Sequence, residues 1–142
     1  MTTHALAFDT LDTAREVDPC PKDLVSVLNK LRFLMVTCRA APRLDLMSAC
    51  AVLSMEGEVA ARRYADTLLR TLRDVLGRAP ILHAPGTEGV SFDEAWLIRM
   101  IDRITQGDEA SMAFLLCRRV PRAQRSGVGF LVRGLAREIE SL

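Results

Sequence analysis

The sequence predicts an all-α fold: a single-domain bundle of about five helices, preceded by a weakly ordered amino-terminal arm. Apolar residues recur at spacings of three and four along most of the chain, which is typical of amphipathic helices. No alternating run of β-branched residues exceeds a few positions, so strand signals are missing. With 142 residues, of which 49% are hydrophobic, the chain can bury one core without a disulfide, metal or cofactor, and we expect none.

The pattern of charges along the chain limits its location. The longest stretch without a charge, 46–55, is too short to span a bilayer, so we expect no contact with a membrane. The first 11 residues hold no basic segment followed by a continuous apolar segment, so they do not resemble a signal peptide. We therefore expect an intracellular, cytoplasmic protein.

The chain divides into an arm, residues 1–20, and a helical domain, residues 21–142, because no Gly/Ser/Pro-rich linker separates it further. In the arm, Leu6, Phe8 and Leu11 are able to dock on the domain.

The clearest amphipathic helix runs from 21 to about 40. Its apolar positions follow a helical period at Leu24, Leu28, Leu31, Met35 and Cys38. Its second half, 33–38, is apolar nearly all round, so we expect this helix in the middle of the bundle.

The next segment, 44–76, continues a helical period but contains Gly57, a residue that weakens a helix interior. The segment is therefore either one long helix or two, and a helix-turn-helix motif with Gly57 in the turn is the sharper alternative. Gly57, Ala61 and Ala65 recur every four residues, which predicts a ridge of small residues for close helix packing.

Start and stop signals define the next elements. Gly77 predicts the end of a helix, and 78–90, with two prolines and two glycines, predicts a long loop. Ser91 and Glu94 form an S-x-x-E capping box at the start of a strongly apolar helix.

Two more helices complete the expected bundle. Gly107 closes the apolar helix and Asp108 caps the next one, which ends before Pro121. The last helix is expected to start near 127–129, where two glycines stand.

A cluster of arginines surrounds this last junction: Arg118, Arg119, Arg122 and Arg125. Guanidinium groups beside a helix amino terminus suit phosphate or carboxylate, so the four residues are a candidate anion-binding site. The alternative, which we favour, is that they are solvated or pair with the acidic helix that begins near Asp93.

Metal-ligand spacing is absent, because the four cysteines form no C-x-x-C pair and the chain has only two histidines. Cys20 is a candidate reactive thiol, since it stands beside Lys22 at an expected helix start, where a thiolate is stabilised. The other cysteines are expected to act as core hydrophobes: Cys38, Cys50 and Cys117.

A histidine in the long loop offers one further candidate. His83 with Glu88 could supply a general base and its orienting carboxylate, but a loop histidine is more often a surface residue. No recognisable catalytic motif accompanies the pair.

Two functions follow from these features. We expect a non-catalytic helical interaction or regulatory module, a homodimer with a further unidentified protein partner, because the helices around 24–38 and 96–104 are apolar on more than one face. The alternative is a binder of a phosphorylated or nucleic-acid ligand through the arginine cluster. The formal net charge of +1 disfavours a general nucleic-acid binder.

Overall fold

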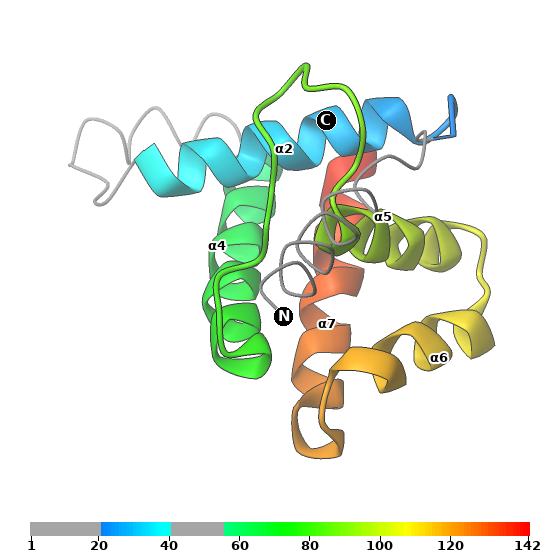
Figure 1. The fold of residues 1–142 in the computed structure, drawn as a ribbon. Coiled ribbons are helices and arrows are strands. Elements are labelled where there is room, and N and C mark those ends of the chain that lie inside the picture. Colours follow the sequence, from blue (N-terminus) through cyan, green and yellow to red (C-terminus); the bar gives the residue numbers. More distant parts are fainter. Residues whose placement is uncertain (1–20, 41–55) are drawn as a thin grey trace, which may run out of the picture.

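The computed structural model describes residues 21–40 and 56–142, and within these ranges it holds five helices and no strand. In chain order they are α2 (Val25–Ala40), α4 (Glu56–Leu76), α5 (Phe92–Thr105), α6 (Glu109–Arg119) and α7 (Arg122–Glu140), labelled as in Figure 1. The predicted all-α bundle is confirmed. The predicted arm, with Leu6, Phe8, Leu11 and Cys20, lies outside the described residues, as does Cys50.

The helices pack around the pair α4 and α7, which share the largest helix contact. Figure 1 shows α2 lying across one end of this pair, while α5 and α6 form a second pair against α7. None of the helices in the described ranges is both long and apolar enough to cross a membrane. Every helix contributes to one core, whose innermost side chains include Leu31, Met35, Ala61, Ala65, Leu68, Leu72, Leu97, Met100, Met112, Val128, Val132 and Leu135.

The helix α2 follows the predicted period, but it is not in the middle of the bundle. Leu28, Leu31 and Met35 are buried, whereas Phe33 is 57% exposed and Val36 is 42% exposed. The expectation of a central helix is therefore wrong. The bundle packs on one face of α2 only and leaves the apolar residues of the opposite face uncovered.

The helix α4 settles part of the question about segment 44–76. Gly57 is the second residue of α4, and 41–55 lies outside the described residues, so the helix-turn-helix alternative stays untested. Ala61 and Ala65 are fully buried, as a ridge of small residues requires. Gly77 follows the last residue of α4 with φ +71°, the left-handed conformation of a glycine C-cap.

The start signals of α5 and α6 are confirmed. The hydroxyl of Ser91 accepts a hydrogen bond from the backbone N–H of Glu94, and the Glu94 carboxylate accepts one from the N–H of Ser91. Asp108 caps α6 by accepting from the N–H of Ser111. Trp96, Leu97, Ile98, Met100 and Ile101 of α5 are almost fully buried, whereas Phe92, its first residue, is 64% exposed.

The start of α7 differs from the expectation. The helix begins at Arg122, directly after Pro121, so the predicted start near 127–129 is wrong. Two of its three glycines lie close to neighbouring helices. A Cβ on Gly129 would lie 3.2 Å from the side chain of Leu116 on α6, and a Cβ on Gly134 would lie 2.2 Å from the ring of Tyr64 on α4.

Two glycine substitutions in α7 should therefore have opposite effects. Gly134→Ala places a methyl group against Tyr64 and should destabilise the fold by about 1–3 kcal/mol, the usual cost of overpacking. Gly127→Ala, with nothing within 4 Å of its Cβ, should stabilise the same helix by about 0.5–1 kcal/mol. Chemical denaturation of both variants and the wild type measures the difference; equal stabilities would contradict the close approach of α4 and α7.

Candidate functional site

A buried cluster of charged groups lies where α5 begins, beneath the loop 78–90. Its centre is an ion pair between α2 and α5, in which Arg32 is 1% exposed and Glu94 is 0% exposed. The Arg32 Nε donates to Glu94 Oε2 at 2.6 Å, and Nη2 donates to Oε1 at 3.0 Å. The geometry is bidentate, the arrangement in which an arginine holds a carboxylate most firmly.

The same arginine also holds the loop. Its Nη1 donates to the carbonyl oxygen of Thr87, and its Nη2 to that of Gly89, both at 2.8 Å. The Glu94 carboxylate accepts a further hydrogen bond from the backbone N–H of His83 at 3.1 Å. One ion pair therefore joins α2, α5 and both arms of the loop.

The neighbouring acid, Asp93, forms a second buried pair. Its carboxylate accepts from Arg78 Nη1 at 2.8 Å, from the N–H of Ile81 at 2.7 Å and from Arg119 Nη2 at 2.6 Å. The guanidinium of Arg119 lies 4.7 Å from the ring centroid of Trp96 and 4.9 Å from that of Phe92. Asp93 therefore ties the end of α6 and the start of the loop to α5.

The partners of both acids change their titration. Burial by itself would raise the pKa of Glu94, but hydrogen bonds from Arg32 and from the N–H groups of Ser91 and His83 outweigh it and lower the pKa. Burial likewise opposes the hydrogen bonds that Asp93 receives from Arg78, Ile81 and Arg119, and the pKa of Asp93 is also lowered. Both groups are carboxylates at neutral pH.

The arrangement is suited to holding the fold together and not to acid–base chemistry. A general base needs a free lone pair and access to a substrate, whereas both carboxylates are buried and surrounded by protein donors. In the part of the chain that the structure describes, no group of histidine, cysteine and acidic residues could hold a metal ion.

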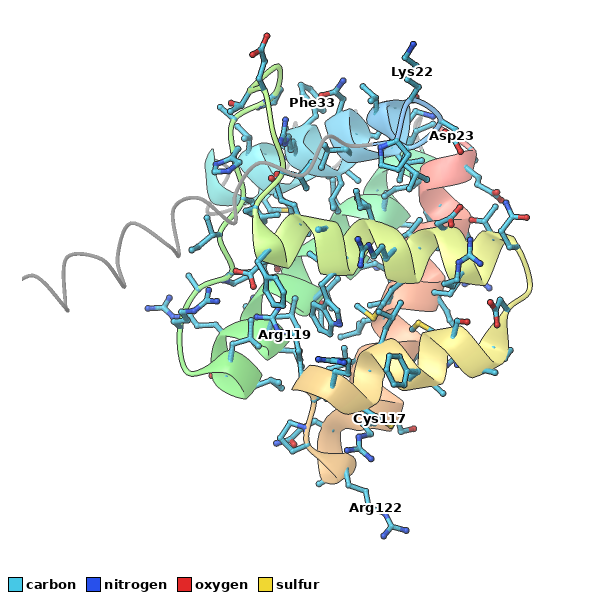
Figure 2. All side chains as sticks on the ribbon, turned by 45° about the vertical axis from the view of Figure 1, so that its right-hand side comes forward. Lys22, Asp23, Phe33, Cys117, Arg119 and Arg122 are labelled. Atoms are coloured by element: carbon cyan, nitrogen blue, oxygen red, sulfur yellow. The ribbon has the colours of Figure 1, made fainter. Side chains whose placement is uncertain are left out.

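The four arginines of the candidate anion site do not gather at one point. Arg119 turns toward α5 and pairs with Asp93, whereas Figure 2 shows Arg122 pointing away into solvent. Arg118 lies over the ring of Phe114 at 5.6 Å, and Arg125 donates from Nε to the carbonyl oxygen of Val120 at 2.8 Å. Anion binding by these residues stays a prediction.

The other candidate residues are separated as well. The side chains of His83 and Glu88 share no hydrogen bond within the described residues. Cys38 is half-buried, and burial, followed by the charge of Asp66, raises the pKa of its thiol. Cys117 is exposed on α6, so the expectation that it is a core residue is wrong.

The most prominent uncovered apolar surface on one helix is that of α2, whose side facing away from the bundle carries Val25, Asn29, Phe33 and Val36. We call these four residues the outer face of α2; all are exposed and they follow a spacing of four, four and three. Figure 2 shows Phe33 on this side. Beside it lies a groove of about 370 Å³, lined by Asn29, Lys30, Phe33, Leu34 and Leu142.

Comparison with known proteins gives no family for this chain: no family model matches it, and neither does any curated protein or solved structure.

Sequence reasoning identified Glu94 as a capping residue and expected the clustered arginines to be solvated or to pair with the helix that begins near Asp93, as Arg119 does. It missed the pair of Glu94 with Arg32 and that of Asp93 with Arg78. A signal for one of them exists in the sequence. Arg32 stands between Leu28 and Met35 on the buried stripe of α2, where an arginine is expected only if it is paired. The sequence does not indicate which acid pairs with it, because Glu94 is 62 residues away.

Removing either partner of the central pair should destabilise the protein strongly. Arg32→Met or Glu94→Gln leaves a buried group without its partner, which costs about 3–5 kcal/mol, and the double variant should lose less than the sum. Arg70→Met, which breaks an exposed pair with Asp66, should cost about 0–1 kcal/mol. Urea denaturation decides this; an additive double variant would show that the two groups are not coupled.

The lowered pKa values predict a specific loss of stability in acid. Because Glu94 and Asp93 have lower pKa values folded than unfolded, their contribution is present above about pH 5 and is lost as the pH falls through the folded values. The free energy of unfolding should fall below about pH 5 by up to about 1.4 kcal/mol per pH unit for each group.

The control for this acid dependence is a pair of glutamine variants. Glu94→Gln should reduce the slope, whereas Glu140→Gln, at an exposed position, should leave it unchanged. Unfolding curves recorded from pH 3 to 7 measure the slopes. Equal slopes for all three proteins would mean that Glu94 does not carry the acid sensitivity.

Proposed function

We propose that this chain is a non-catalytic helical interaction module that associates with a second copy of itself through the outer face of α2. The observation that carries the proposal is the exposure of Phe33 and Val36, 57% and 42%, on a helix whose opposite side is fully packed. Uncovered apolar surface rimmed by polar groups is typical of a protein–protein contact. Of the two segments expected to carry surplus apolar surface, 24–38 keeps exposed valine and phenylalanine side chains, whereas the large apolar residues of 96–101 are buried.

The spacing of the outer face suits a symmetric contact. Val25 and Phe33 stand four residues before and after Asn29. In an antiparallel pair of α2 helices that cross at Asn29, Val25 of one copy faces Phe33 of the other, and the contact repeats about the twofold axis. Such a self-complementary surface is what a twofold dimer requires.

The buried charges support a non-catalytic function, because the carboxylates at the start of α5 are surrounded by protein donors. The proposal includes a cytoplasmic location. A reducing compartment suits Cys38 and Cys117, which are both free thiols. A further protein partner can use the same exposed residues of α2.

A charge on the outer face should prevent the association. The mass of the wild type in solution should rise with concentration from one chain toward two, and Phe33→Glu should keep it at one chain, because a buried aromatic anchor is lost and a carboxylate would have to be desolvated. The affinity should fall at least about 30-fold. Size-exclusion chromatography with light scattering measures the mass.

The matched control is Phe114→Glu, at a phenylalanine of α6 that is 59% exposed and lies outside this face. It should associate like the wild type. A wild type that stays at one chain up to hundreds of micromolar would overturn the proposed function, and equal loss in both variants would overturn the assignment to α2.

A further inference from the structure

We propose that the surface around the turn from α6 to α7 binds single-stranded nucleic acid, with arginines on the phosphates and two exposed phenylalanines against the bases. This surface consists of Phe92, Phe114, Arg118, Arg119, Arg122 and Arg125, and we call it the arginine surface. Figure 1 shows α2 at the opposite end of α7 from this turn. The arginine surface is therefore separate from the outer face of α2, and one chain can use both.

The formal net charge of +1 conceals a separation of charge along the chain. Residues 88–109 hold six acids and two arginines, whereas residues 118–137 hold six arginines and no acid. The helix α6 repeats this separation, because Glu109 stands at its start and Arg118 and Arg119 stand at its end, about 15 Å away along the axis. The small net charge disfavours binding of nucleic acid over the whole protein, but not contact with a short single strand at the basic end of α6.

Three arginines of this surface have no acid to neutralise them. Arg118 and Arg122 are exposed and Arg125 is partly exposed, and within the described residues the ion pairs of α6 and α7 use other arginines. Arg118 lies over an aromatic ring, and Arg125 donates to a backbone carbonyl oxygen. Neither contact removes the positive charge.

The acids nearest to these arginines do not restore the balance. Arg119 and Arg78 share the single carboxylate of Asp93, which leaves one positive charge over. The end of α4 that leads to Arg78 adds one charge of each sign, from Arg73 and Asp74. The region therefore keeps a surplus of positive charge, which attracts an anionic partner.

The placement of the arginines favours a polymer over a small anion. Arg119 turns toward α5, whereas Figure 2 shows Arg122 pointing away from the bundle. A single phosphate or sulfate is held by donors that converge on it. A nucleic acid carries a phosphate at every residue and can contact separated guanidinium groups one after another.

Two exposed phenylalanines distinguish a nucleic acid from other polyanions. Phe92 is 64% exposed and Phe114 is 59% exposed. The guanidinium of Arg119 lies 4.9 Å from the ring centroid of Phe92, and that of Arg118 lies 5.6 Å from that of Phe114. Aromatic rings beside arginines are the groups on which single strands stack their bases, which a duplex keeps stacked on one another. Phospholipid headgroups offer the charge without the ring.

The charge contribution can be tested with the full chain and a fluorescently labelled thymidine oligomer of about 20 nucleotides, by fluorescence anisotropy. The wild type should bind, and the logarithm of its affinity should fall linearly with the logarithm of the salt concentration. Arg118→Gln/Arg122→Gln should weaken binding at least about tenfold and reduce this slope by about 1.4, because two phosphate contacts are lost. Arg63→Gln/Arg70→Gln removes the same charge from exposed positions of α4 and should bind almost as the wild type does.

The stacking contribution is tested by Phe114→Leu. This variant should bind the oligomer about fivefold more weakly or worse, with an unchanged salt dependence, because a base loses its aromatic partner and no charge changes. The matched control is Phe130→Leu, at a phenylalanine of α7 that is 63% exposed and lies against Tyr64. Equal affinities of these two variants would overturn the proposal, because the surface would then act by charge alone.

Two competitors separate a nucleic acid from other acidic partners. Polyglutamate and vesicles that contain phosphatidylserine carry negative charge without bases, so neither should displace the oligomer at an equal concentration of charge. Displacement by either one would overturn the proposal in favour of an acidic protein or a membrane surface. An oligomer that binds the wild type no more tightly than it binds Arg118→Gln/Arg122→Gln would overturn it as well.

Discussion

The bidentate pair between Arg32 and Glu94 is the interaction on which most of the described structure depends. It is fully buried, and it joins α2 to α5 while its remaining donors hold the carbonyl oxygens of the loop. A buried pair of this kind gains little over a well-packed apolar contact, but it is costly to break. The pair fixes where the loop lies, because the guanidinium donors of Arg32 that do not contact Glu94 are satisfied by carbonyl oxygens of the loop.

Much of the fold could be predicted because its signals are local. The capping box at Ser91, the C-cap at Gly77 and the N-cap at Asp108 each depend on a few neighbouring residues, and all three are confirmed. The start of α7 could not be predicted in the same way. Gly127 and Gly129 indicated a helix start in the sequence, but both lie inside α7, where Gly129 packs against Leu116 on α6.

The candidate site was less predictable than the fold for the same reason. Four arginines near one turn allowed an anion site or pairing with the helix that begins near Asp93, and Arg119 makes the second kind of contact and lies apart from the other three. The two partners are 26 residues distant in the sequence, so spacing alone does not reveal which of the four arginines forms the pair. The apolar surplus of α2 was visible in the sequence, whereas the side on which it would stay uncovered depended on where α4 and α5 pack.

The double role of Glu94 has a consequence for the motions of the protein. The same carboxylate caps α5 and receives the N–H of His83 from the loop, so neither the first turn of the helix nor the loop can open while the other stays closed. Local opening here is therefore a cooperative event that includes both segments, and their amides belong to one unit of hydrogen exchange. Amides of the loop 78–90 that are held in this way are therefore expected to exchange together with those of the first turn of α5.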